Sequence, residues 1–161
     1  KPLFPSPDFS ALFFMCHALA HFVSGQANLR FFCDWALLLH AYKGKWDVQR
    51  YHQALEEAGC IKVVDALTSL TVRYMGLNPE YAPPYKSDEP FEDKLWEEIM
   101  NPPPLLSKEN RTPWMVFFYK CKKIGKCYPR HRMVYPGRYL NKLWHSFCFH
   151  IQHHSTIWKL G

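Results

Sequence analysis

One long apolar segment, residues 25–40 (GQANLRFFCDWALLLH), most constrains how this chain of 161 residues can fold. Asn28 can cap a helix, and no proline or glycine follows it before Tyr42. Apolar side chains would lie on nearly every face of that helix, so we expect it to be central and largely buried. Arg30 and Asp34 lie one turn apart within it, and a buried helix must pair both charges with each other or with an outside group.

Apolar residues recur at helical spacing before and after this segment as well. The predicted helices of the first half cover residues 8–23, 28–42, 47–58 and 61–75. Short turns marked by glycine separate them, and such turns imply antiparallel neighbours. We therefore expect a four-helix core over residues 8–78.

The second half of the chain is organised by proline. Residues 79–112 form a predicted Pro-rich connection that carries one short acidic helix over 89–100. Residues 113–124 suit either a strand or a helix, and we favour a helix because Thr112 and Pro113 fit its start. A turn and a last helix over residues 138–158 follow.

Taken together, these patterns predict an all-α fold, a helical bundle of about six or seven helices with Pro-rich connections. We expect a single helical domain over residues 1–161, with residues 113–161 as its C-terminal helices. The chain opens on Lys1 in a Pro-rich stretch that resembles a linker, so we expect it to be part of a longer protein.

Charge is unevenly distributed along the chain, whose formal net charge is +6. Residues 88–98 hold six acidic residues and one Lys, whereas residues 120–132 hold six Lys or Arg and no acid. Two solvated faces would explain this, and so would a basic patch that meets an acidic partner or nucleic acid. The predicted basic patch is Lys120, Lys122, Lys123, Lys126, Arg130 and Arg132.

The six cysteines do not have the regular spacing of a disulfide framework. No signal peptide or convincing transmembrane helix is visible in the sequence. We therefore expect reduced thiols, a cytoplasmic location and no membrane partner. His17 and His21 could bind a metal from one helical face, but no third ligand is evident, so no metal site is predicted. Arg138 and His145 have the spacing of the active-site motif in helical ribonuclease-like domains of the HEPN type. A helical ribonuclease is therefore one alternative hypothesis for the function.

Residues 17–38 carry a more specific pattern. It reads His17–x3–His21–Phe22, then Gly25, then Leu29–Arg30–x2–Cys33–Asp34–Trp35–Ala36–Leu37–Leu38. This pattern resembles the helical part of a bacterial family of uncharacterised nucleotidyltransferases. In that family, a nucleotidyltransferase-fold domain with a Gly-Ser turn and an Asp-x-Asp carboxylate pair comes first, and the helical region follows it. The resemblance covers about residues 10–80.

The chain has neither a Gly-Ser turn nor an Asp-x-Asp pair. The resemblance therefore implies the helical, cleft-lining part of a Mg²⁺-dependent nucleotidyltransferase, inactive alone. Its partner would be the missing catalytic domain of the same protein, which would use Mg²⁺ and a nucleoside triphosphate; no cofactor is expected in this chain. The residues expected to face the cleft are His17, His21, Arg30 and Asp34. The alternative reading is a non-enzymatic interaction module that uses the basic patch.

Overall fold

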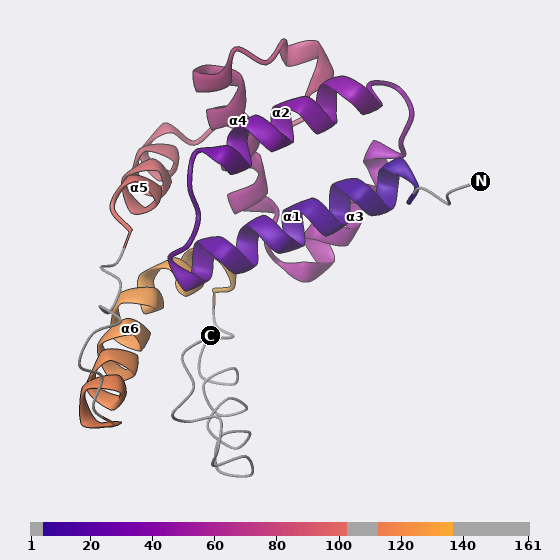
Figure 1. The fold of residues 1–161 in the computed structure, drawn as a ribbon. Helices are drawn as coiled ribbons and strands as arrows, with labels where there is room; N and C mark the ends of the chain where they lie inside the picture. The colour runs from indigo at the N-terminus through magenta and orange to yellow at the C-terminus, as the bar shows by residue number, and fades with distance from the viewer. Residues whose placement is uncertain (1–4, 103–112, 137–161) are drawn as a thin grey trace. The chain divides into compact units, whose positions relative to one another are not determined.

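The structure is a computed structural model that describes residues 5–102 and 113–136 (Figure 1). Over these residues it contains six α-helices, one 3-10 turn and no strands. The elements are α1 (Pro7–Ser24), α2 (Arg30–Tyr42), α3 (Val48–Ala58), α4 (Ile61–Met75), the 3-10 turn η1 (Pro79–Tyr81), α5 (Glu89–Met100) and α6 (Pro113–Val134). The predicted all-α fold class is confirmed.

The chain divides into two compact units, Lys1–Pro102 and Pro103–Gly161. The boundary falls within the predicted Pro-rich connection of residues 79–112. The first unit contains α1 to α5, and the second contains α6. The predicted last helix over residues 138–158 lies outside the described residues.

The start of α2 differs by one residue from the prediction that Asn28 caps it: Leu29 is the N-cap, and the Asn28 side chain accepts the N–H of Arg30 at 3.0 Å.

A polar cap and two glycines set the ends of α3 and α4 where the sequence predicted them. The side chain of Asp47 accepts a hydrogen bond from the backbone N–H of Arg50, at 3.0 Å, and begins α3. Gly59 and Gly76 follow the ends of α3 and α4 with φ angles of 72° and 67°, a left-handed conformation that glycine adopts without steric cost. These boundary predictions are confirmed.

The start of α1 differs from the prediction that Asp8 caps it. Ser6 is the N-cap, and its hydroxyl oxygen accepts a hydrogen bond from the N–H of Phe9 at 3.2 Å. The carboxylate of Asp8 instead accepts the N–H of Asp47 at 2.6 Å. Asp8 therefore ties the first turn of α1 to the loop before α3, a contact that sequence spacing does not reveal.

The central helix of the first unit is α4. Every residue from 63 to 71 is buried, and α4 packs against α2, α3 and α5. Two of its buried hydroxyls are hydrogen-bonded. That of Thr71 donates to the carbonyl oxygen of Leu67 at 2.7 Å, and that of Thr68 accepts the indole N–H of Trp35 at 3.2 Å. Burial of these polar groups is therefore tolerated.

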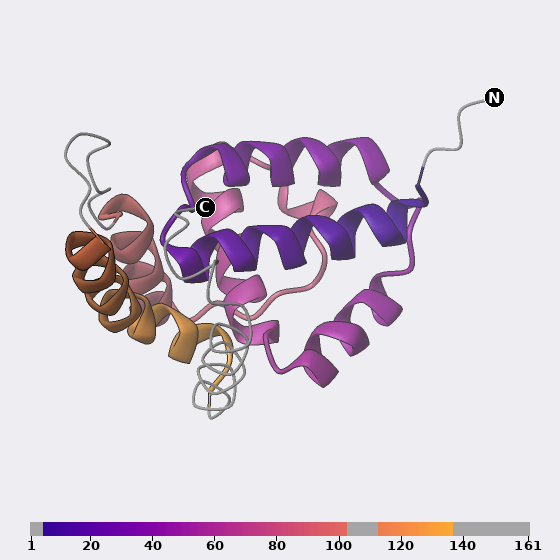
Figure 2. The same cartoon turned by 60° about the horizontal axis from the view of Figure 1, so that its bottom comes forward.

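In contrast, α2 is buried along one stripe only. Phe32, Trp35 and Leu39 are buried, whereas Leu37 is 68% exposed and Cys33 is also exposed. The prediction of burial on nearly every face was wrong, because apolar composition alone does not say how many neighbours a helix has. Two views show α1 and α2 side by side and antiparallel, which leaves each with an outer side (Figures 1 and 2).

In the second unit, α6 runs without interruption from Pro113 to Val134. The favoured helix over residues 113–124 is confirmed, but the basic segment that follows is helical rather than a turn. Pro129 lies inside this helix, where a proline ring ordinarily clashes with the carbonyl four residues earlier. That earlier residue is Gly125, the residue type whose backbone adapts most readily.

Candidate functional site

The two histidines of the predicted cleft lie together on α1 and meet α2. The ring centroids of His17 and His21 are 4.4 Å apart. The ring centroid of His21 is 5.3 Å from that of Phe31. The ring centroid of His17 is 6.2 Å from Phe31. His17 is exposed and His21 half-buried, so both imidazoles lie at the surface of the first unit.

Arg30 and Asp34 lie on the same side of α2 and form an ion pair within one helical turn. Arg30 Nε lies 3.3 Å from Asp34 Oδ2, and the Arg30 side chain is 83% exposed. A surface pair of this kind contributes little to stability, about 0.3–0.5 kcal/mol. The expected pairing is present, but the pair is exposed and not buried. Phe31, next to Arg30 in the sequence, contacts both histidines, so the four predicted residues lie on two helices that pack side by side.

The outer side of α1 extends this surface with apolar rings. Phe9 and Phe13 are more than half exposed. Their ring centroids are 5.9 Å apart, and the ring of Phe13 stacks on that of His17 at 6.0 Å. A row of rings at four-residue spacing therefore leads from the start of α1 to the paired histidines.

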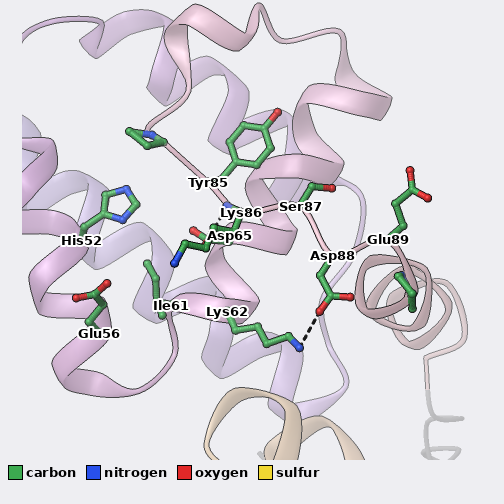
Figure 3. Close-up of a pocket in the computed structure, with 12 residues that line it drawn as sticks. His52, Glu56, Ile61, Lys62, Asp65, Tyr85, Lys86, Ser87, Asp88 and Glu89 are labelled. Carbon is green, nitrogen blue, oxygen red and sulfur yellow. Dashed lines mark hydrogen bonds and ion pairs between the residues drawn. The ribbon is translucent and has the colours of Figure 1, made fainter.

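A second site, which sequence reasoning missed, is a cavity of about 910 Å³ in the first unit. It is lined by parts of α3, α4, the segment before α5 and the first turn of α5 (Figure 3). The lining residues that carry charge or can titrate are His52, Glu56, Lys62, Asp65, Tyr85, Lys86, Asp88 and Glu89.

Asp65 is the buried acid of this cavity, at only 8% exposure. Its Oδ2 accepts the backbone N–H of Lys86 at 3.2 Å, which fastens the segment before α5 to α4. Burial raises the pKa of Asp65, although the Lys86 N–H and the charge of His52 partly oppose that effect. Nε2 of His52 is itself buried and has no hydrogen-bond partner in the part of the chain that the structure describes.

The opposite end of the cavity is held by paired groups. Lys62 Nζ lies 2.8 Å from Asp88 Oδ2, and this hydrogen bond lowers the pKa of Asp88. The buried carboxylate of Glu92 accepts the Ser87 hydroxyl at 2.7 Å and the Asp88 N–H at 3.0 Å. These contacts fix the cavity rim at the start of α5.

Asp65→Asn should change how stability depends on pH. The raised pKa means that the folded chain holds the Asp65 proton to a higher pH than the unfolded chain does. This contribution to stability is complete below the unfolded pKa of about 3.9 and is lost as the pH rises through the folded pKa. An asparagine cannot ionise, and its oxygen can still accept the Lys86 N–H. Urea unfolding at pH 4 and pH 7 should therefore show that the variant gains stability relative to the native chain at the higher pH.

Glu89→Gln is the control for that measurement, since Glu89 lines the same cavity but is exposed and is not among the groups that shift the pKa of Asp65. It should leave the pH dependence of unfolding nearly unchanged. An Asp65→Asn variant whose stability relative to the native chain is the same at pH 4 and pH 7 would show that the Asp65 carboxylate is not desolvated.

The predicted basic patch is only partly a surface feature. Lys122, Lys126 and Arg132 are exposed and Lys123 is half-buried, but Arg130 is only 4% exposed. The side chain of Lys120 lies outside what the structure describes. So do Arg138 and His145, the two residues of the ribonuclease reading.

No helix within residues 5–102 and 113–136 is long and apolar enough to cross a membrane. Over the same residues, no three His, Cys, Asp or Glu side chains converge in a way that could hold a metal ion. Comparisons with protein-family models, curated proteins and solved structures find no match to this chain. The resemblance to the nucleotidyltransferase family stays a prediction from the residues of segment 17–38.

Proposed function

We propose that this chain is the helical, cleft-lining part of a nucleotidyltransferase-like protein whose catalytic carboxylates belong to a separate domain. The observation that carries the proposal is the shared placement of His17, His21, Arg30 and Asp34 at the surface of adjoining helices. Residues that served only to pack the fold would be buried, as Trp35 is. Polar side chains gathered at a surface beside exposed rings are instead available to another domain or to a substrate.

Arg30 is suited to hold a phosphate group in this arrangement. Its Nε donates to Asp34, while the two terminal nitrogens carry N–H groups that no described residue accepts. A guanidinium can donate two parallel hydrogen bonds to phosphate oxygens, and such charge-assisted bonds are stronger than neutral ones. The imidazoles of His17 and His21 add further donors on the neighbouring helix.

The described residues of the α1–α2 surface are poorly suited to hold Mg²⁺ by themselves. Mg²⁺ is held through carboxylates and phosphate oxygens, whereas the carboxylate of Asp34 is already paired with Arg30. The described residues also contain no cluster of three ligands for a metal. Under the proposal, the metal and the chemical step belong to the other domain, and the α1–α2 surface contributes binding and orientation.

The experiment compares this chain with its parent protein, meaning the chain together with the segment encoded directly upstream. Each purified protein is incubated with Mg²⁺ and nucleoside triphosphates labelled on the α-phosphate, and label transfer and pyrophosphate release are measured. The proposal predicts no turnover by the chain alone and turnover by the parent. It also predicts a Gly-Ser turn and an Asp-x-Asp pair in the upstream segment. Turnover by the chain alone, or an upstream segment without those residues, would overturn the proposal.

A further inference from the structure

We infer that the C-terminal part of this chain binds the surface of an anionic phospholipid membrane through one face of α6. The first observation is how the charge is divided along the sequence. Residues 1–109 contain ten Lys or Arg and fourteen Asp or Glu, for a formal charge of −4, whereas residues 110–161 contain ten Lys or Arg and no acid, for +10. The excess positive charge of the protein therefore resides entirely in its last third, which favours an anionic partner.

The second observation is the exposed face of α6. Trp114, Phe118, Lys122 and Lys126 follow one another at four-residue spacing, so they lie along one side of the helix. Trp114 is 71% exposed and Phe118 is 65% exposed, and both lysines are exposed as well. Met115, next to Trp114, is also exposed. Large apolar side chains and cations thus share one accessible face.

The kinds of side chain on this face indicate the kind of partner. Trp114, Met115 and Phe118 lie in the first two turns, and Tyr128 farther along is also 44% exposed. A helix that carries such rings beside cations can lie in the plane of a membrane interface, with its apolar side chains inserted by about 5–10 Å at the boundary between headgroups and acyl chains. The stems of Lys122 and Lys126 can then reach back, so that their ammonium groups lie among the headgroup phosphates.

A single-stranded nucleic acid suits this face less well. Its phosphates repeat evenly along the strand, and proteins that bind it combine cations with stacking rings along one groove. On α6 the exposed apolar side chains of the first two turns precede the exposed lysines, and they include Met115, which is not a stacking side chain. The expectation of no membrane partner was drawn from the absence of a spanning segment, and it does not bear on a helix that lies at the surface.

The test uses the purified full chain and sedimentation with vesicles of phosphatidylcholine alone or with 30% phosphatidylglycerol, a composition chosen for the assay. We expect binding to the anionic vesicles that weakens as salt is raised, because the charge contribution is screened. Changing both Lys122 and Lys126 to Glu should weaken binding about thirtyfold or more. Each cation removed from near the membrane surface is expected to lower the affinity about fivefold. Changing Trp114 and Phe118 together to Ala should remove the binding that persists at high salt.

The control variant is Lys45→Glu with Lys94→Glu, which makes the same charge change at exposed sites of the first unit. It should retain at least a third of the native affinity, and circular dichroism should show that all variants keep their helix content. Equal loss in the control and in the Lys122/Lys126 variant would overturn the assignment to α6. Absence of binding to anionic vesicles would overturn the proposal itself, and so would tighter binding to a single-stranded oligonucleotide than to those vesicles.

Discussion

Replacing Trp35 with alanine is expected to lower the free energy of unfolding by about 3–5 kcal/mol. Trp35 is 1% exposed, and its ring stacks on that of Phe14 with centroids 5.5 Å apart. It lies close to the ring of Tyr51 as well, at 6.2 Å, and its indole N–H donates to Thr68 at 3.2 Å. One side chain therefore joins α1, α3 and α4 to α2, and its removal leaves a cavity that no single neighbour can fill.

Urea titration of Trp35→Ala and Leu37→Ala would measure this effect with an internal control. Leu37 lies on the same helix, two residues away, but is 68% exposed. Its replacement should change the free energy of unfolding by no more than about 0.5 kcal/mol. Because folded domains are stable by only about 5–15 kcal/mol, the contrast would be large. Similar losses at both positions would mean that α2 is buried all round, as the sequence first indicated.

Helix ends were the most predictable part of this fold. Gly59 and Gly76 follow their helices in the left-handed conformation, and Asp47 caps α3, because each of these signals acts within one turn of its own residue. Ser6 and Asp8 show where such local reasoning ends. Both can cap a helix, and Pro7 at the first helical position favours Ser6, but no local signal reveals that Asp8 bonds to Asp47, 39 residues away.

The identity of the central helix could not be read from hydropathy. The segment containing α2 is more apolar than α4, yet α4 is the more deeply buried. Small polar residues such as Thr68 and Thr71 make hydrogen bonds with neighbouring groups, so burial costs them little. Hydropathy treats these residues as surface residues and therefore underestimates how deeply their helix is buried.

The candidate sites differ in how far the sequence could reveal them. Residues 17–38 are contiguous, so one pattern was enough to single out His17, His21, Arg30 and Asp34. The cavity at Asp65 is built from residues within 52–65 and 84–90, and only the fold brings these two segments together. One signal was present: Asp65 is a lone acid within the apolar run Val63–Leu67, the same kind of anomaly that drew attention to Arg30 and Asp34.

The proposed function predicts that Arg30→Ala in the parent protein reduces nucleotidyl transfer by about tenfold to a hundredfold. That range corresponds to the loss of a charge-assisted hydrogen bond, worth about 1.5–3 kcal/mol. Because the Arg30 side chain is 83% exposed and its ion pair with Asp34 is weak, the variant should fold with nearly native stability. The loss would therefore reflect substrate binding or orientation rather than unfolding.

The central claim is that the α1–α2 surface serves the active site of a larger protein, and one comparison tests it most directly. Label transfer from an α-phosphate-labelled nucleoside triphosphate is measured for the parent protein carrying either Arg30→Ala or Arg50→Ala. Arg50 is an exposed arginine on α3 and provides the matched loss of charge. We predict that Arg30→Ala loses at least nine-tenths of the transfer rate while Arg50→Ala keeps most of it. Equal rates for the two variants would contradict the claim.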